Sequence, residues 1–229
     1  MPSDSKREGA EGSPMRSRIY DFEAEGITVH WDYHRCIHVE ACIRTLPSVF
    51  YRHKRPWIDP TQASVEEVVR ACEACPTGAL HYTRKDGGPA EATPEKNEIV
   101  VSQDGPLFVK GDVSIADEAG EPILQETRVA LCRCGHSRNK PLCDGSHEKE
   151  GFRHDGALTE AHLNGGAEGP SDGGALTIRA ADPGPLLLQG SAEIRSEAAP
   201  NCCHVRVGAL CCCGKSKNKP FCDGSHAEG

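Results

Sequence analysis

Apolar positions along this chain come in short runs that glycine and proline interrupt. Residues 27–34, ITVHWDYH, predict a strand, and residues 64–75, SVEEVVRACEAC, predict a helix. Ser64 and Glu67 mark the start of the helix, because they stand three residues apart as in a capping box. Pro76 follows and would end the helix. This part of the chain therefore has an α+β pattern.

The rest of the chain predicts strands and repeats itself. Residues 105–115, GPLFVKGDVSI, and 184–194, GPLLLQGSAEI, predict short β-type runs between glycines, and residues 127–134, TRVALCRC, predict a strand leading into cysteines. Many positions recur 79 residues later without a gap, which indicates a duplicated unit. The recurring pairs are Gly105/Gly184, Pro106/Pro185, Leu107/Leu186, Gly111/Gly190, Ile115/Ile194, Cys132/Cys211, Cys134/Cys213, Cys143/Cys222 and His147/His226. We expect each unit to be a small β-sheet with a ligand loop.

Two stretches rich in glycine, proline and glutamate are predicted linkers, at 86–97 and 164–174. The first 18 residues are polar and of mixed charge, which predicts a disordered lead. The expected divisions are a lead at 1–18, an α+β segment at 19–86, and repeat units at 97–163 and 175–229.

Composition narrows the classes of function. The 13 cysteines crowd together as CRC, CCC and CEAC, where neighbours cannot pair without strain, so free thiols are expected. No secretory segment or membrane-spanning run is visible, which predicts a reducing, cytoplasmic location and no membrane association. A formal net charge of -8 disfavours nucleic acid as a partner.

Each repeat contains four candidate metal ligands with the spacing C-x-C-x8-C-x3-H. They are Cys132, Cys134, Cys143 and His147 in the first repeat, and Cys211, Cys213, Cys222 and His226 in the second. A tetrahedral zinc site is the simpler interpretation of such a donor set. The C-x-C pair argues against it, because ligands one residue apart are strained around one small ion, whereas two sulfide-bridged irons need two protein ligands each. One iron would take the close pair, and the other would take cysteine and histidine.

The motifs CRCGHSRNKPLCDGSH at 132–147 and CCCGKSKNKPFCDGSH at 211–226 resemble the CDGSH iron-sulfur domain, the mitoNEET-like family. The resemblance implies a 2Fe-2S cluster with three cysteines and one histidine in each copy, two clusters in all. Members of this family dimerise with swapped strands, so two copies in one chain imply a monomer with an internal pseudo-twofold axis, with a homodimer as the other option. No membrane-anchor helix precedes the first copy, which removes the reason to expect a mitochondrial outer-membrane location.

Other residues of the two motifs are expected to support the clusters. Asp144 and Asp223 are predicted to cap a short helix by accepting backbone N–H groups. Gly145 and Gly224 are predicted to adopt positive φ or to approach the cluster closely, and Ser146 and Ser225 to donate hydrogen bonds to sulfur. Cys202 and Cys203 align with Ile123 and Leu124, so they are expected to serve as small apolar residues.

The first segment contains HRCIHVEAC at 34–42 and CEACPTGAL at 72–80, close to the ferredoxin layout C-x2-C-x2-C…C-P but with Val39 in place of the middle cysteine. It resembles the divergent single-cluster ferredoxin family, also in its KRPWI stretch at 54–58. The resemblance implies a ferredoxin-like domain with Cys36, Cys42 and Cys75 as ligands. Three cysteines suit a 3Fe-4S cluster, and a 4Fe-4S cluster needs one more ligand, for which His38 and Cys72 are the candidates. Cys72 lies three residues before Cys75, so a role in the core is equally consistent with its position.

Three clusters, without a nucleotide-binding loop or a nucleophile–base pair, predict a carrier rather than an enzyme. The predicted activities are electron transfer and iron-sulfur cluster transfer, with a redox or cluster-acceptor protein as partner. The alternative is a zinc-stabilised Cys3His interaction module.

Overall fold

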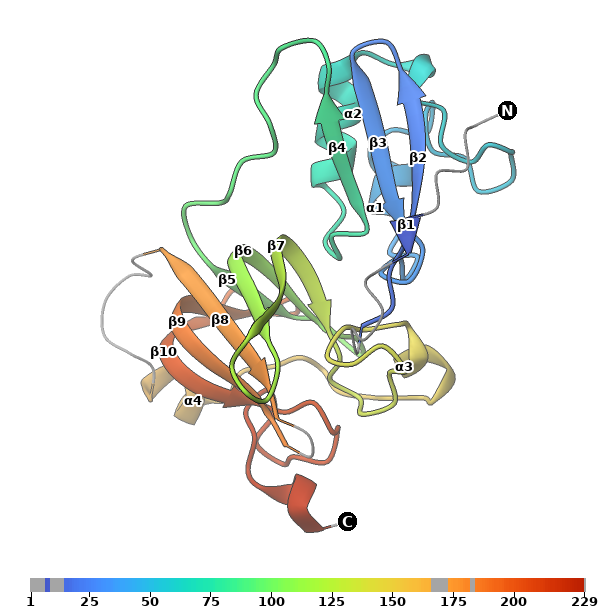
Figure 1. Cartoon of the computed structure of the whole chain (residues 1–229). Helices are drawn as coiled ribbons and strands as arrows, with labels where there is room; N and C mark the ends of the chain where they lie inside the picture. Colours follow the sequence, from blue (N-terminus) through green and yellow to red (C-terminus); the bar gives the residue numbers. More distant parts are fainter. Residues whose placement is uncertain (1–6, 9–14, 166–172, 182–183, 229) are drawn as a thin grey trace. The chain divides into compact units, whose positions relative to one another are not determined.

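The computed structural model describes residues 7–8, 15–165, 173–181 and 184–228, and the chain forms two compact units, 1–92 and 93–229 (Figure 1). Most of the predicted lead at 1–18 lies outside the described residues, as do residues 166–172 of the second predicted linker. None of the helices in the described part of the chain has the length and apolar character that crossing a bilayer requires.

The first unit is built on an antiparallel sheet with strand order β1-β2-β3-β4. The predicted strand at 27–34 is confirmed over 27–32. Gly26 joins β2 to β3 with a φ of 83°, a conformation that glycine adopts without strain. The strands are β1 (Arg7–Glu8), β2 (Arg18–Ala24), β3 (Ile27–Asp32) and β4 (Leu80–Arg84).

Helices pack against this sheet and close its core. They are α1 (Ala41–Thr45), the 3-10 helix η1 (Pro60–Gln62) and α2 (Val65–Glu73). The capping box is confirmed, because Ser64 Oγ accepts from Glu67 N–H and the Glu67 carboxylate accepts from Ser64 N–H at 3.0 Å. Val68 of α2 is fully buried with Val29 of β3 and Phe50, and this core fixes the loops around the α2 C-terminus.

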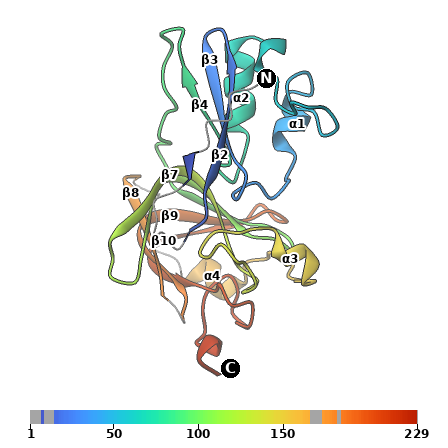
Figure 2. The same cartoon turned by 45° about the vertical axis from the view of Figure 1, so that its right-hand side comes forward.

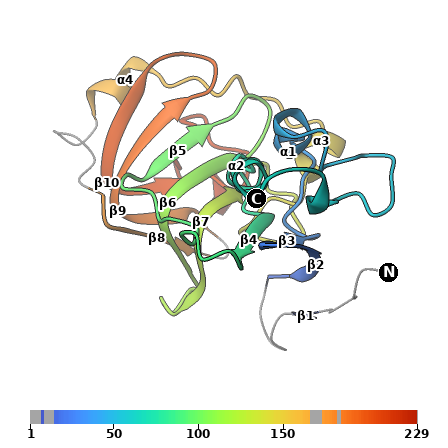
Figure 3. The ribbon, with the colours of Figure 1, turned by 90° about the horizontal axis from the view of Figure 1, so that it is seen from above.

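The second unit contains both repeats in one six-stranded sheet, whose curvature is visible in Figure 3. The strand order is β10-β9-β5-β6-β7, and β8 pairs with β6 and β9. The strands are β5 (Glu98–Val101), β6 (Leu107–Ala116), β7 (Pro122–Leu131), β8 (Ala175–Ala180), β9 (Leu186–Ser196) and β10 (Cys202–Leu210). The short helices are α3 (Ser146–Lys149), α4 (Glu160–Asn164) and the 3-10 helix η2 (Ser225–Glu228).

The two repeats exchange their first strands. β5 pairs antiparallel with β6 of its own repeat and parallel with β9 of the other repeat. In the same way, β8 pairs antiparallel with β9 of its own repeat and parallel with β6 of the other. The registers correspond: Glu98 faces Lys110 as Thr177 faces Gln189, 79 positions further on in both strands. Neither repeat therefore completes its sheet alone.

The glycines at 111 and 190 do not separate short strands, as the sequence predicted, but lie inside β6 and β9. Gly111 has a φ of 156°, and the ladder with β7 shifts register beside it. A Cβ on Gly190 would lie 2.4 Å from the Ala175 carbonyl oxygen. Glycine is required there because the exchanged strand passes too closely for a side chain.

Candidate metal centres

The first repeat places its four predicted ligands in two close pairs after the end of β7. Cys132 follows Leu131, the last residue of β7, and its sulfur lies 3.8 Å from that of Cys134. The sulfur of Cys143 lies 3.4 Å from Nδ1 of His147, the second residue of α3. Two thiolates bound at ~2.3 Å to one tetrahedral ion lie about 3.8 Å apart. The close pair is therefore spaced as two ligands of one ion.

The second repeat reproduces this geometry after β10. The sulfurs of Cys211 and Cys213 are 3.8 Å apart, and Cys222 Sγ lies 3.2 Å from His226 Nδ1. The two sites differ in burial. All four side chains of the first site are buried, whereas Cys213, Cys222 and His226 of the second are only half-buried.

Local hydrogen bonds lower the pKa of Cys132, whereas burial raises the pKa values of Cys143 and Cys211. In the first site the neighbouring thiol of Cys134, followed by backbone N–H groups of the loop, lowers the pKa of Cys132 to about 6. Gly145 N–H donates to Cys143 Sγ, and Gly224 N–H donates to Cys222 Sγ, both at 3.4 Å. Burial lowers the pKa of His147, which favours the neutral ring that can bind a metal.

The aspartates of the two motifs accept backbone N–H groups, but not as helix caps. The N-cap of α3 is Gly145, so the predicted capping role of Asp144 is wrong. Asp144 instead accepts from Ser146 N–H at 3.0 Å and Arg138 N–H at 2.9 Å, and Asp223 does the same with Ser225 and Lys217. Each carboxylate thus ties the residues after the third cysteine to the loop between the second and third cysteines.

The serines of the motifs do not donate to sulfur in this structure. Ser225 Oγ donates to Asp223 at 2.6 Å, and the Ser146 hydroxyl hydrogen-bonds to Asp144. These bonds hold the pKa of Asp223 far below its usual range, with the Ser225 hydroxyl the largest cause. The predicted positive φ is confirmed for both glycines, at 83° for Gly145 and 90° for Gly224.

The ligand loops that follow β7 and β10, two strands labelled in Figure 2, meet at an isolated bridge between Cys134 and Cys213. Gly135 and Gly214 make this approach possible, because a Cβ on either would lie 2.7 or 2.8 Å from a carbonyl oxygen of the opposite loop. Both glycines have positive φ, 89° and 79°. The second cysteines of the two sites are therefore neighbours.

The residue inside each C-x-C pair differs between the repeats. Arg133 is buried and donates to the carbonyl oxygens of Gly105 at 3.0 Å and Ser102 at 2.5 Å, and burial lowers its pKa to about 10. Cys212 takes its place in the second repeat, and its thiol donates to the Gly184 carbonyl at 2.9 Å. A cation thus lies beside the first site where the second has a neutral thiol.

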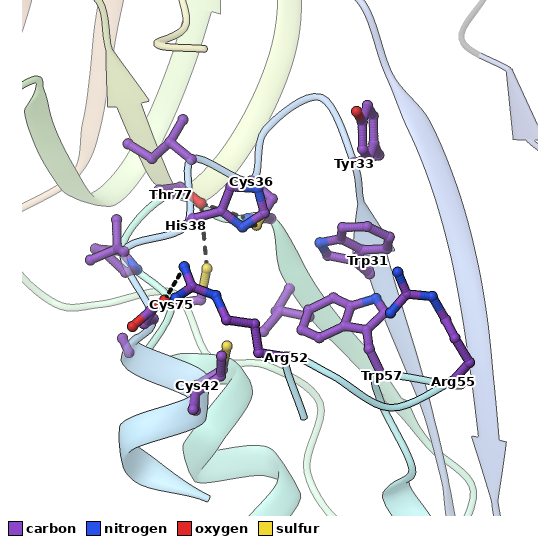
Figure 4. A pocket seen from close by; sticks show the side chains of 18 residues that line it. Trp31, Tyr33, Cys36, His38, Cys42, Arg52, Arg55, Trp57, Cys75 and Thr77 are labelled. Atoms are coloured by element: carbon purple, nitrogen blue, oxygen red, sulfur yellow. Dashed lines mark hydrogen bonds and ion pairs between the residues drawn. The ribbon is translucent and has the colours of Figure 1, made fainter. Parts of the chain in front are cut away.

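The predicted ligands of the first unit line a cavity of about 370 Å³ (Figure 4). Cys36 reaches it from the loop between β3 and α1, Cys42 from α1 itself, and Cys75 from just after α2. The loop holds two non-glycine residues at positive φ, His38 at 57° and Glu40 at 63°. Backbone conformations of this kind persist where surrounding contacts enforce them, often at functional sites.

The structure separates the two candidates for a fourth ligand. His38 lines the cavity, with Nδ1 3.9 Å from Cys36 Sγ. Cys72 is fully buried in the hydrophobic core of the unit and is not among the side chains that line the cavity. His38 therefore lies at the cavity beside Cys36, and Cys72 lies in the core.

The side chains around the cavity fit an iron-sulfur cluster. Burial, followed by the nearby thiols of Cys75 and Cys36, raises the pKa of Cys42 to about 12. Three thiolates this close are unfavourable without a cation, and bound metal ions deprotonate such thiols. The indole N–H of Trp31 is buried, and in Figure 4 it faces Cys36, whose thiol pKa it lowers against the larger, raising effect of burial. Sulfur of a bound cluster would accept a hydrogen bond from this indole.

Trp31→Phe is expected to lower the reduction potential of the cluster in the first unit without removing it. A hydrogen bond to cluster sulfur stabilises the more negative, reduced state, so its loss favours the oxidised state. Redox titration followed by EPR measures the shift. Tyr20→Leu, which removes a ring that packs on Trp31 but does not line the cavity, is the matched control. No shift in Trp31→Phe, or an equal shift in the control, would contradict this role.

Sequence patterns did not single out Trp31 or Arg52 as part of this site. Trp31 packs edge-on against Trp57, with ring centroids 4.7 Å apart, and Arg52 forms an ion pair with Glu40 at 2.5 Å. The tryptophan of the KRPWI stretch, Trp57, was the one available signal. Trp31 and Arg52 line the cavity because of how the chain folds, which no local sequence pattern indicates.

Comparisons with known proteins agree with this arrangement. A family model described as "Iron-binding zinc finger CDGSH type" matches residues 104–148 and 183–227, and one described as "Divergent 4Fe-4S mono-cluster" matches 22–85. "Uncharacterized protein YjdI" from Escherichia coli strain K12 is 34% identical to this chain over 64 residues. The aligned residues cover 28% of this chain and 84% of that protein. The protein of the same name from strain O157:H7 has the same identity and coverage. No solved structure matches significantly. The matched segments include every ligand proposed above.

Proposed function

The chain belongs to the CDGSH-type iron-binding and divergent 4Fe-4S mono-cluster families, and we propose that this iron-sulfur protein carries three clusters and transfers electrons or whole clusters. Each CDGSH-type unit would hold a 2Fe-2S cluster through three cysteines and a histidine. The first unit would hold a 4Fe-4S cluster through Cys36, Cys42, Cys75 and His38.

One observation carries the proposal for the repeats: their ligands stand in two pairs. The pair of cysteines and the pair of cysteine and histidine are each spaced as ligands of one tetrahedral ion, in both repeats. Two irons joined by sulfide need two protein ligands each. The clusters supply one-electron chemistry, and the protein fixes the ligands and donates hydrogen bonds to them.

The exchange of strands between the repeats supports an internal pseudo-dimer. Corresponding registers place the repeats in equivalent environments around the contact of Cys134 with Cys213. Two clusters held in adjacent loops would exchange electrons readily. No catalytic activity on an organic substrate is proposed, and the partner would be a protein that accepts electrons or a cluster.

Metal and sulfide analysis of anaerobically purified protein tests the proposal. We expect about eight irons and about eight acid-labile sulfides per chain, from two 2Fe-2S clusters and one 4Fe-4S cluster. About seven irons with the same sulfide would indicate a 3Fe-4S cluster. Colourless protein containing zinc and no sulfide would overturn the proposal and favour the structural zinc module.

A further inference from the structure

A second type of metal-binding arrangement lies on the outer face of β9 and β10, away from the ligands described above. It consists of Glu193, Cys202 and His204, whose carboxylate oxygen, sulfur and ring nitrogen all lie within 4.8 Å of one another. Cys202 is exposed, which corrects the expectation that it serves as an apolar residue, whereas Cys203 is buried as expected. The three donors are therefore accessible to an ion from solvent.

Strand register explains why these side chains meet. His204 stands directly opposite Glu193 in the antiparallel pair, and Cys202 is two residues from His204 on the same strand. Side chains two residues apart in a strand share a face, so both β10 donors project beside Glu193. Cys203 and Val205, between and after them, point into the core.

The imidazole of His204 lacks the hydrogen bonds that usually hold such a ring. Its Nδ1 is buried without a partner among the described residues. Its Nε2 lies 3.9 Å from the Glu193 carboxylate, too far for a hydrogen bond. The side chains of His204 and Glu193 are 29% and 37% exposed. Water therefore covers them only in part, and they do not hydrogen-bond to each other. A cation bound between the carboxylate and Nε2 would give each of these two donors a partner.

The first repeat provides an internal comparison. The residues 79 positions earlier are Ser114, Ile123 and Gln125, and Gln125 Nε2 donates to Ser114 Oγ at 2.9 Å. At the equivalent place in the sheet, the first repeat thus has a hydrogen-bonded pair, Ser114 with Gln125, and the apolar residue Ile123. All three positions carry metal donors in the second repeat only. The difference is unrelated to the cluster ligands, which both repeats share.

We propose that Glu193, Cys202 and His204 bind one zinc-class divalent ion, with water in the remaining position. One thiolate, one imidazole and one carboxylate are all common zinc ligands, and three protein ligands plus water are typical of an open zinc site. Magnesium and calcium prefer oxygen donors alone and do not match this set. Binding displaces the thiol proton of Cys202 to solvent, so the affinity for zinc rises with pH. This site is independent of the three proposed clusters.

Zinc titration of the untagged, cluster-loaded chain against a chromogenic zinc chelator tests the site. We expect one zinc per chain to bind while the visible absorbance of the protein stays constant. Cys202→Ser and His204→Gln should each weaken binding by at least about 100-fold, since residues that only support metal ligands are already worth about 10- to 100-fold. Cys203→Ala, which removes a neighbouring thiol on the opposite face, should bind zinc as the parent does.

Transfer of the three donors to the first repeat gives a second, independent test. The variant Ser114→Glu, Ile123→Cys, Gln125→His is expected to bind two zinc ions per chain instead of one. Three results would each overturn the proposal: no zinc binding by the parent chain, unchanged affinity in Cys202→Ser, or zinc uptake that rises only as the visible absorbance falls. In the last case zinc would be occupying vacated cluster ligands.

Discussion

His226→Cys is expected to remove the faster of two phases in the acid-driven loss of visible absorbance from the CDGSH-type sites. Neutral imidazole is the weakest of the four ligands, and a protonated ring cannot hold iron. Burial lowers the pKa of His147, so its ring becomes protonated only at a lower pH than an exposed imidazole would. His226 is half-buried and His147 is 8% exposed, so protons should reach the second site first.

Stopped-flow absorbance after a jump from pH 7.5 to pH 5.5 measures both phases. His147→Cys should slow the slower phase by at least several-fold and leave the faster one intact, so each variant is the control for the other. His53→Asn, which replaces an exposed histidine of the first unit, should leave both phases unchanged. Equal decay rates in the parent and both cysteine variants would show that histidine protonation does not limit cluster loss.

Features that depend on neighbouring residues, and the duplication of the ligand loops, could be predicted from the sequence. Ser64 and Glu67 predicted the start of α2 because a capping box needs only residues three apart. The ungapped repeat predicted equivalent ligand loops, since one duplicated unit tends to fold in one way. Cys132 and Cys134 are likewise fixed by the strand that precedes them.

Contacts between distant segments could not be read in the same way. The proximity of Glu193 to His204 depends on the register of β9 with β10, because they are 11 residues apart in sequence and opposite in the sheet. A one-residue slip would separate them onto different faces.

Burial decided the role of Cys72 for the same reason. The helical spacing of Cys72 and Cys75 allows both to bind one cluster, or one to bind and the other to pack. Only the packing of α2 on the sheet shows that Cys72 joins Val68 in the core while Cys75 lines the cavity. A sequence spacing therefore identifies candidate ligands, and the fold selects among them.

Replacement of Cys36, Cys42 or Cys75 by serine is expected to abolish the EPR signal of the cluster in the first unit, whereas Cys72→Ala should retain it. Each of the first three removes a thiolate from the cavity, and the remaining ligands cannot hold the cluster against competing water and thiols. Cys72→Ala instead removes buried packing and should lower the free energy of unfolding of this unit by about 1 kcal/mol. EPR of the reduced protein, with iron per chain, measures the first effect, and thermal unfolding measures the second.

His38→Ala separates a four-iron from a three-iron cluster in that cavity. If His38 binds the fourth iron, its loss should lower iron from about eight to about seven per chain while acid-labile sulfide stays at about eight. The signal of the oxidised protein should then be that of a three-iron cluster, and His38→Cys should restore the fourth iron. His34→Ala, two residues before Cys36, is the matched control and should leave iron unchanged. Retention of eight irons in His38→Ala, or their loss in Cys72→Ala, would assign the fourth position to another residue and contradict the geometry of the cavity.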